Sequence, residues 1–484
     1  MSFSLFIPIL IALIIIGAFI LILTDDGDAD RKLLWLITIS VLPVVGLILY
    51  LMFGINYRHR KYFLKKHKRY ADWFAQRSGD RIDKLLRGDE SMVEDGYRPF
   101  VKLLAGKMLP GVTDNNDVEI ITYGPRKLEA LLNDIRQAKE YIHFQYYLFG
   151  NDVSGQAVKE ALMTKAREGI KVRILHENVA NYDTKRSFYN EMRKAGVELV
   201  RFYNPRFHPL RIITRLNYRN HRKIVVIDGR IGYTGGMNIK DRYFTKWRDT
   251  HLRIIGPAVA SLQHIFLDSW MTSGGELDHN PEYFFPEEYH SSSDVTVPGT
   301  LINKPMQITP DEPDSSWPRL QFAYLWAIQH ARDYIWIQTP YFVPPESVLE
   351  ALKTSALSGV DVRVMVPAES ENFFMGPAVK SYYKECLKAG IKIYERGGGF
   401  IHSKTFVADD YLSSVGTANI DNRSLNINYE VNTYLYDKET ALRCKEIFMK
   451  DLEISEEIKF QDWEHIPVGR KIKMNIIRLF ASQL

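Results

Sequence analysis

The sequence predicts an α/β protein built from two similar halves and preceded by two membrane helices. Three observations support this prediction: an internal repeat, an alternation of strand-like and helix-like segments, and two apolar runs at the N-terminus. The chain has 484 residues, 46% hydrophobic and 25% charged, which suffices for two or three domains. Its net charge of +5 is small for this length, so the positions of the basic residues are more informative than their sum.

The two apolar runs cover 3–23 and 33–53, and each is long enough to cross a bilayer core of about 30 Å as a helix. The segment 57–69, rich in Lys and Arg, follows the second run and indicates a cytoplasmic flank. We therefore expect a two-helix transmembrane hairpin over 1–56 in the cell membrane, with both termini and the catalytic domain in the cytoplasm. A cleaved signal peptide is the alternative for the first run, but it lacks a basic start and a small-residue cleavage site.

The remaining chain divides by composition into five parts. We expect a basic juxtamembrane linker over 57–115, a first half over 116–272 and a second half over 317–468. The connection between the halves, 273–316, is rich in Pro, Gly, Ser and acidic residues. The end of the chain, 469–484, fits either an amphipathic helix on the membrane or a terminal packing helix.

Strand-like and helix-like segments alternate in both halves, which indicates βαβ units and a parallel or mixed sheet covered on its faces. Because the second half repeats the order of the first, the halves should pack about a pseudo-two-fold axis. The strands expected in the first half are 118–122, 141–148 and 172–175, and the helices are 126–139, 155–168 and 188–194. Those expected in the second half are strands 334–341 and 362–366 and helices 322–332, 346–357 and 381–388.

The repeat is defined most clearly by two copies of the pattern H-x-K-x4-D, which begin at His221 and His402. The match continues beyond the motif at the same offset of 181 residues. It pairs Gly235 with Gly416, Asn238 with Asn419, and Asp249 with Glu430. A single motif of this kind is a weak signal, but two copies that share a long register are a strong one.

The residues of the repeat suggest phosphoryl-type chemistry. In a strand, a histidine and the lysine two positions later point to the same side, so each half offers an imidazole beside an ammonium group. Such a set fits a phosphodiester and its more highly charged transition state. One imidazole would attack phosphorus and form a phospho-histidine, and the other would act as acid and then base. The lysines neutralise charge, so we expect neither a metal nor another cofactor at this site. The candidate catalytic residues are His221, Lys223, Asp228, His402, Lys404 and Asp409, with Asn238, Asp249, Asn419 and Glu430 in support.

The carboxylates of the repeat have different expected roles. Asp228 and Asp409 begin turn-like pairs at the end of the apolar run, so a structural role is favoured over a catalytic one. Asp249 and Glu430 are better candidates for the carboxylates that hydrogen-bond the histidines and fix their tautomers. Asn238 and Asn419 would supply amide donors to the phosphate.

One insertion distinguishes the halves, because 203–219 precedes the first motif and has no counterpart in the second half. Its arginines alternate with apolar residues, which fits either a contact with an anionic amphiphile or a solvated surface loop. The arginines of the insertion are Arg206, Arg211, Arg215 and Arg219.

The two cysteines, Cys386 and Cys444, have no metal-ligand spacing and are expected to be buried as small apolar side chains.

The paired motifs resemble those of the phospholipase D superfamily, whose two H-K-D motifs meet in one active site. The resemblance to bacterial cardiolipin synthases is closer, and it extends over nearly the whole chain. It rests on the two apolar segments, on Gly235–Asp241 with Trp247–His251, and on Thr339–Pro344 with Asn422–Glu430. It implies two tandem phospholipase D-like α/β/α sandwich halves. The segment 309–316 departs from the Gly-Pro-Asp-like sequence expected there.

The resemblance also implies an activity, the joining of two phosphatidylglycerol molecules into cardiolipin with release of glycerol. By that likeness His221 is the nucleophile and His402 the acid and base, an order that the spacing does not give. The main alternative is a membrane-anchored phospholipase D that uses water as acceptor.

A nuclease and a lipid-binding scaffold are the remaining classes. A nuclease would require a broad basic surface with stacking aromatics, and the membrane hairpin argues against it. A scaffold would not need His, Lys and Asn in both halves. The expected partners are phosphatidylglycerol, anionic membrane lipid and the membrane, without nucleic acid, and the oligomeric state is left open.

Overall fold

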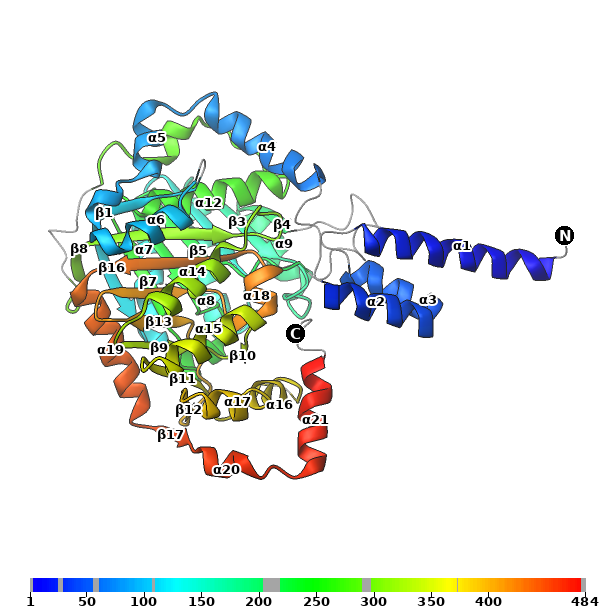
Figure 1. Cartoon of the computed structure of the whole chain (residues 1–484). Helices are drawn as coiled ribbons and strands as arrows, with labels where there is room; N and C mark the ends of the chain where they lie inside the picture. The colour runs from blue at the N-terminus through cyan, green and yellow to red at the C-terminus, as the bar shows by residue number, and fades with distance from the viewer. Residues whose placement is uncertain are drawn as a thin grey trace.

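The computed structural model describes residues 3–24, 29–54, 61–106, 109–202, 218–289, 297–371 and 373–479. Within these ranges the chain forms a body of strands and helices from which N-terminal helices project (Figure 1). The predicted α/β class is confirmed, because strands of both directions form a mixed sheet that alternates with helices along the chain.

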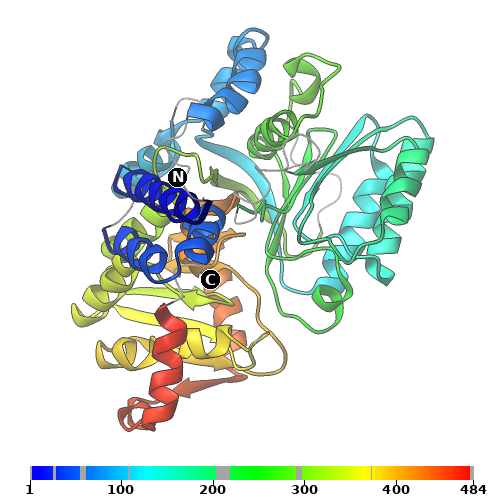
Figure 2. The same ribbon diagram turned by 90° about the vertical axis from the view of Figure 1, so that its right-hand side faces the viewer.

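One sheet of 15 strands runs through the described body, and the two halves lie side by side within it (Figure 2). The strands of the first half, from the centre outward, are β1 (Val112–Ile121), β7 (His251–Ile255), β6 (Ile231–Gly235), β5 (Ile224–Ile227), β2 (Tyr141–Tyr146), β3 (Lys171–Glu177) and β4 (Glu198–Phe202). Those of the second half are β8 (Leu301–Asp311), β16 (Glu430–Tyr436), β14 (Leu412–Gly416), β13 (Thr405–Ala408), β9 (Tyr334–Gln338), β11 (Asp361–Pro367), β12 (Lys392–Arg396) and β17 (Ser455–Ile458).

The strand order has the symmetry of the sequence repeat. β1 and β8 pair antiparallel at the centre, and each half then continues outward with corresponding strands in the same order. In each half one strand pairs antiparallel with the motif strand and parallel with the next strand outward, as β2 does with β5 and β3. A separate parallel pair, β10 (Phe342–Val343) and β15 (Ile420–Asp421), lies in the second half.

Helices cover both faces of the sheet, which explains why β5 is apolar at every position and β13 at all but its first residue, Thr405. In β5, Ile224 and Val226 pack with α12 (Val259–Thr272). Val225 and Ile227 pack on the other face with α7 (Gly124–Gln137), α8 (Val153–Arg167) and α9 (Arg186–Lys194).

The second half repeats this arrangement. Val407 of β13 packs with α19 (Lys438–Leu452), while Phe406 and Ala408 face a set of helices on the opposite side. The two halves therefore have the same layered construction. The helices on that opposite side are α14 (Arg319–His330), α15 (Glu346–Leu357), α16 (Met375–Lys380) and α17 (Tyr383–Lys388).

The N-terminal region is helical but differs from the prediction. α1 covers Phe3–Leu23, and the second apolar run is divided into α2 (Ala29–Val41), α3 (Pro43–Leu49) and a π-helix, η1 (Tyr50–Gly54). The break lies at Pro43, because proline restricts the preceding residue to non-helical angles, and Leu42 has φ −128° and ψ 74°. The prediction of one continuous helix over 33–53 is therefore wrong. In the described part of the chain, no helix is both long enough and apolar enough to cross a membrane.

The expected linker, 57–115, contains more structure than predicted. Helix α4 (Lys61–Ala75) packs on α12, and α6 (Arg98–Leu104) packs on α14. Residues 55–60 lie outside the described residues, so the first part of the predicted basic cluster, 57–60, is not described. Between α4 and β1 lie α5 (Asp80–Arg87), η2 (Glu90–Met92) and η3 (Asp95–Tyr97).

The expected connection between the halves contains a central strand. β8 lies within 273–316, pairs with β1 and β16, and belongs to the second half. Two prolines in its sequence, Pro305 and Pro310, hid the strand pattern. The predicted helix 381–388 begins later than expected as α17, directly after α16. The remaining helices are α11 (Asp241–Thr245), α13 (Pro281–Phe284), α18 (Asn422–Asn426), α20 (Phe460–Glu464) and α21 (Val468–Leu479).

Candidate active site

The two motifs meet where the halves pair with each other outside the regular strands. The backbone N–H of His221 donates to the carbonyl of Tyr429 at 2.9 Å, and that of His402 donates to the carbonyl of Arg248 at 2.7 Å. The two bonds are equivalent under the 181-residue offset of the repeat. Two isolated β-bridges, Asn220 with Tyr429 and Arg248 with Ile401, join the same segments. The pseudo-two-fold arrangement therefore brings both motifs into one site.

Each histidine is hydrogen-bonded to a carboxylate from the opposite half. Nδ1 of His221 lies 2.9 and 3.0 Å from the two carboxylate oxygens of Glu430, and Nδ1 of His402 lies 2.7 Å from Oδ2 of Asp249. Both carboxylate side chains are fully buried. With Nδ1 held in this way, Nε2 is the ring nitrogen left to act on a substrate.

The two lysines lie beside their histidines. Nζ of Lys223 donates to the carbonyl of His221 at 2.6 Å, and Nζ of Lys404 donates to the carbonyl of His402. Lys404 also lies 2.8 Å from Nδ1 of His402, a nitrogen that Asp249 contacts as well. Because an ionised carboxylate can only accept, we assign the ring proton to Nδ1 as donor to Asp249.

Burial makes both imidazoles neutral at pH 7. It lowers the pKa of His221 to about 4, where Glu430 opposes the shift and Lys223 adds to it. Burial also lowers the pKa of His402, and the charge of Lys404 lowers it further. The neutral imidazole is the nucleophilic form, so the free site suits attack by a histidine.

The carboxylates remain ionised at pH 7, while the lysines are less basic than usual. Burial raises the pKa of Asp249 to about 6, and Lys404 opposes this shift. For Glu430 burial also acts upward, but the interactions with His221, Lys223 and Thr417 together outweigh it and the pKa is lowered. Burial lowers the pKa of Lys404 to about 8. Burial also lowers the pKa of Lys223. A bound anion would raise both lysine pKa values again.

Aromatic rings form walls around the histidines. The ring of Tyr147 meets that of His221 edge-on, with centroids 4.8 Å apart. Tyr243 meets His402 edge-on at 5.3 Å, and Trp247 lies 5.2 Å from the same imidazole. Sequence reasoning gave no role to these three rings, although Tyr243 and Trp247 closely follow Gly235 and Asn238 of the first repeat.

The two asparagines already have partners within the protein. Oδ1 of Asn238 accepts the N–H of Leu148 at 3.0 Å, and its Nδ2 donates to the hydroxyl of Tyr243 at 2.8 Å. Nδ2 of Asn419 donates to Asp421 at 3.0 Å. In the described structure Asn238 thus supports a ring that contacts His402. Donation from either amide to a phosphate stays a prediction.

The motif aspartates lie at the far end of their strands. The carboxylate of Asp228 accepts the backbone N–H groups of three successive residues, 139–141, and that of Asp409 accepts those of 332–334. Both aspartates have positive φ, 51° and 49°, in the turn that follows the strand. These contacts fit the structural role that was favoured from the sequence, and a part for either aspartate in catalysis stays a prediction.

Two arginines and a threonine that sequence reasoning missed support the carboxylates. Nε of Arg222 donates to the carbonyl of Glu430 at 2.9 Å, and Arg248 donates to the carbonyl of Asp249 at 2.7 Å. The hydroxyl of Thr417 donates to the carboxylate of Glu430 at 2.6 Å. Arg248 lies in the segment Trp247–His251 that carries the family resemblance, but none of the three positions matches across the repeat, so nothing marked them as supports for the carboxylates.

Two further predictions concern ligands around the site. Most of the insertion, 203–217, lies outside the described residues, and of its arginines only Arg219 is described, 3.7 Å from Glu177.

Among the residues that the structure describes, the one group with the spacing of metal ligands is His67, Asp268 and Glu312, which includes no motif residue.

Comparison with known proteins identifies the family. The model of the cardiolipin synthase, phospholipase D-like domain matches residues 131–270 and 324–452, and a phospholipase D-nuclease N-terminal model matches 12–54. The chain is 36% identical to the major cardiolipin synthase ClsA of Bacillus subtilis, over 99% of both chains. It is also 36% identical to cardiolipin synthase 2 of Bacillus anthracis, over 96% of this chain and 88% of that one.

The fold has a solved counterpart as well. The phosphatidylserine synthase of Haemophilus influenzae superposes with a TM-score of 0.57 at 15% identity, over 76% of this chain and 95% of that one. That likeness concerns the fold alone. The two sequence relatives match nearly the whole chain, and the family model matches both halves. The chain therefore belongs to the cardiolipin synthase family of phospholipase D-like proteins.

Proposed function

We propose that this protein is a cardiolipin synthase, which transfers a phosphatidyl group from one phosphatidylglycerol molecule to another and releases glycerol. The observation that carries this proposal is the pair of histidines that are hydrogen-bonded to carboxylates of opposite halves. The choice of lipid rests on relatives that are named cardiolipin synthases and match nearly the whole chain.

In the first step, Nε2 of His221 attacks the phosphorus of phosphatidylglycerol. A nitrogen–phosphorus bond forms, and the bond from phosphorus to the head-group glycerol oxygen breaks. Glu430 holds the ring proton on Nδ1, which keeps a lone pair on Nε2. The bound phosphate raises the pKa of His402 by favouring its cation, so that imidazolium can protonate the leaving glycerol oxygen.

In the second step, neutral His402 removes a proton from the primary hydroxyl of a second phosphatidylglycerol. The resulting oxygen attacks phosphorus, the nitrogen–phosphorus bond breaks, and cardiolipin leaves with His221 restored. Lys223 and Lys404 stabilise the charge that develops on the phosphoryl oxygens in both steps. Aromatic walls around the imidazoles reduce the access of water to the phospho-histidine, which favours an alcohol acceptor.

A product assay tests this proposal. Purified full-length protein in mixed micelles with labelled phosphatidylglycerol and no added divalent metal should give cardiolipin and glycerol in equal amounts. His221→Ala and His402→Ala should each abolish turnover and leave lipid binding nearly unchanged. Phosphatidic acid as the sole product would replace the transferase with the phospholipase D alternative, and full turnover in both variants would end the mechanism.

We also propose that the N-terminal region and α21 attach the enzyme to the membrane. Figures 1 and 2 place α1 and α21 on the same side of the body. The described part of α1 has exposed apolar side chains and no charged residue. On α21, Met474 and Ile477 pack inward, while a stripe of apolar residues at helical spacing remains exposed between basic residues. The stripe is Val468, Ile472, Ile476 and Leu479.

The proposed topology has two crossings over 1–56, with both termini and the catalytic body in the cytoplasm. The native Cys386 and Cys444 are buried, so an introduced cysteine can be labelled selectively. An impermeant maleimide on intact cells should label Thr24→Cys and spare the exposed Asn151→Cys until the cells are opened. Labelling of Asn151→Cys in intact cells, or protection of Thr24→Cys, would contradict this topology.

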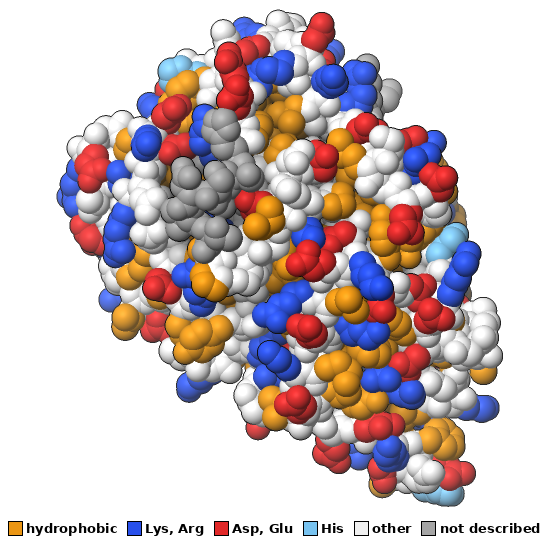
Figure 3. All heavy atoms as spheres, turned by 90° about the vertical axis from the view of Figure 1, so that its left-hand side faces the viewer, with side chains coloured by type: hydrophobic (Ala, Val, Ile, Leu, Met, Phe, Trp, Pro, Cys, Tyr) orange, Lys and Arg blue, Asp and Glu red, His pale blue; other side chains and the backbone are white. Residues whose placement is uncertain are grey.

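A nucleic-acid substrate receives no support from the surface in Figure 3. Basic and acidic side chains are interspersed on that face, and no broad area of one sign stands out. A nuclease would need a continuous basic path to bind the phosphate backbone. The mixed charge of this face is ordinary for a soluble protein surface.

A further inference from the structure

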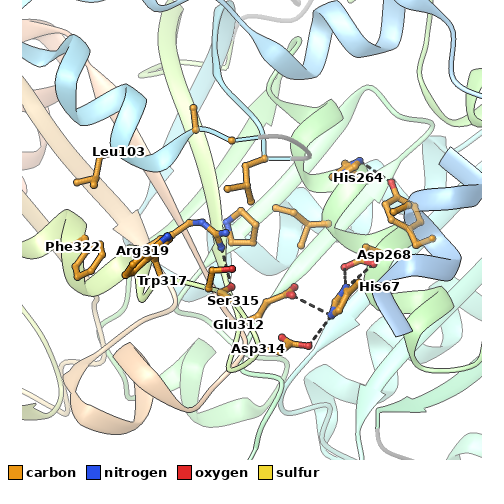
Figure 4. A pocket seen from close by; sticks show the side chains of 18 of the residues that line it. His67, Leu103, His264, Asp268, Glu312, Asp314, Ser315, Trp317, Arg319 and Phe322 are labelled. Atoms are coloured by element: carbon orange, nitrogen blue, oxygen red, sulfur yellow. Dashed lines mark hydrogen bonds and ion pairs between the residues drawn. The ribbon is translucent and has the colours of Figure 1, made fainter. Parts of the chain in front are cut away.

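A second cluster of chemistry-bearing residues lies apart from the histidine motifs, in a cavity of about 1040 Å³. The cavity lies between α4, α6, α12 and the segment that joins β8 to α14. Apolar side chains such as Leu103, Leu109 and Phe322 form part of its wall. Figure 4 shows that Asp268, Glu312 and Asp314 gather around the imidazole of His67, at one side of the cavity.

Four titratable side chains from three separate segments meet at this side. Nδ1 of His67, on α4, lies 2.8 and 3.0 Å from the carboxylate oxygens of Asp268, on α12. Its Nε2 lies 3.1 Å from Oδ2 of Asp314 and 3.4 Å from Oε2 of Glu312, both in the segment after β8. One ligand atom each from His67, Asp268 and Glu312 lies within 4.8 Å of the others.

Cations balance the carboxylates of the cluster. Glu312 forms an ion pair with Arg222 at 2.8 Å, Arg319 lines the same cavity, and His67 can carry one further positive charge. One acidic side chain nevertheless has an unpaired oxygen. The Asp314 side chain is only 4% exposed, and its Oδ1 is buried without a hydrogen-bond partner. An unpaired carboxylate oxygen in a buried site is costly unless a ligand completes it.

We propose that this cluster binds a divalent metal ion through Nε2 of His67 and the carboxylates of Glu312 and Asp314, while Asp268 holds Nδ1 of the same ring. Oδ2 of Asp314 and Oε2 of Glu312 lie 3.1 and 3.4 Å from Nε2 of His67. These separations fit a shared ion, since metal–nitrogen and metal–oxygen bonds of about 2.0–2.2 Å place ligand atoms up to about 4.4 Å apart. One imidazole with carboxylates suits Mn²⁺ or Zn²⁺, and the cavity gives water access to open positions.

The ion, with Asp268 on the other side of the ring, would connect three parts of the molecule. His67 belongs to the helix that follows the N-terminal apolar region, Asp268 to the first half, and Glu312 and Asp314 to the segment that enters the second half. Arg222, which pairs with Glu312, also donates to the carbonyl of Glu430 at 2.9 Å. The ion would therefore fix α4 against both halves and stiffen a contact one residue away from His221.

A binding experiment that does not depend on activity tests the site. Full-length protein in detergent is stripped with a chelator and titrated with Mn²⁺, and free Mn²⁺ is followed by electron paramagnetic resonance. We expect one Mn²⁺ per chain and a rise in Tm, with binding weakened at least tenfold in His67→Gln and Asp314→Asn. The exposed His279→Gln and Asp462→Asn are matched controls and should bind like the unaltered protein.

The outcomes separate this site from the proposed function. Binding that is lost in the two cluster variants and kept in both controls supports the site, whatever the transferase assay gives. Failure to bind Mn²⁺ or Zn²⁺, or equal binding in all variants, would overturn it. In that case the cluster is a proton-bound clamp, since burial lowers the pKa of His67 but Asp268 and Glu312 raise it to about 12. A normal circular dichroism spectrum for Asp314→Asn excludes misfolding as the cause of lost binding.

Discussion

Replacing Glu430 by glutamine tests the crossed pairing of histidines and carboxylates. Glu430 is fully buried and lies 2.9 Å from Nδ1 of His221, so the substitution keeps its shape but adds an N–H donor. The amide can donate to Nδ1 and move the ring proton to Nε2, which removes the attacking lone pair. In serine proteases the analogous loss of the orienting carboxylate lowers kcat about 10⁴-fold, which corresponds to roughly 5 kcal/mol. We expect a loss of similar size here.

The matching substitution, Asp249→Asn, should affect a different step. Asp249 lies 2.7 Å from Nδ1 of His402, which is proposed to protonate the leaving oxygen. A phosphatidyl ester of p-nitrophenol needs no such protonation, because p-nitrophenolate is a stable leaving group. In a stopped-flow assay this ester should restore the first step in Asp249→Asn to near the unaltered rate. It should leave Glu430→Gln slower by about 100-fold or more.

The result that would refute the crossed assignment is the opposite pattern, with Glu430→Gln rescued by the ester and Asp249→Asn still slow. Each histidine would then depend on the carboxylate of its own half. Unaltered kcat in both variants would refute a positioning role for either carboxylate. Glu129→Gln, a mostly exposed glutamate on α7, is the control for the substitution itself, and Tm measurements confirm that each variant is folded.

Three further predictions follow from the site. The folded-state pKa of His221, lowered to about 4, makes the unfolded chain bind more protons between pH 4 and 6.5. This histidine should therefore lower the free energy of unfolding by on the order of 3 kcal/mol as pH falls through that window. His221→Gln should for this reason resist denaturant better than the unaltered protein at pH 4.5 but not at pH 7. A Cβ at Gly236 would lie 2.0 Å from Oδ1 of Asp249, so Gly236→Ala should lower kcat about 100-fold in the micelle assay, while Gly96→Ala, with open space around it, should not. Asp409→Asn weakens a carboxylate that accepts three backbone N–H groups, so it should lower the free energy of unfolding by about 1–3 kcal/mol and leave the kcat of folded enzyme nearly unchanged.

Sequence reasoning predicted the elements with regular periodicity well. Helix α15 has the predicted bounds, Glu346–Leu357. Each motif strand begins one residue later than expected, directly after its lysine, so the motif histidines and lysines precede the strands. β8 escaped prediction because Pro305 and Pro310 interrupt its pattern. Pro305 is tolerated since it lies where the register with β1 shifts. Pro310 lies beyond the residues that pair with β1, opposite Val431 of β16. α12 also went unpredicted, because it is apolar on nearly all sides and lacks an amphipathic period.

The crossing of the carboxylates is beyond what the sequence contains. Asp249 and Glu430 each follow their own motif histidine at the same distance, so the repeat is equally consistent with pairing within a half and between halves. Only the packing of the halves decides, and here His221 pairs with Tyr429 and His402 with Arg248 through their backbones. The contacts of the tyrosine and tryptophan rings with the histidines could not be predicted from the sequence either, because the placement of a ring depends on tertiary packing.

The central claim is that His221 forms the covalent intermediate while His402 transfers the proton. The most direct measurement is peptide mass spectrometry of His402→Ala after rapid reaction with the p-nitrophenyl phosphatidyl ester. The mechanism predicts a phosphatidyl group on the peptide that contains His221, because attack proceeds with this leaving group while transfer to an alcohol lacks its base. A phosphatidyl group on another residue, or none in a variant that still releases p-nitrophenol in a burst, would contradict it.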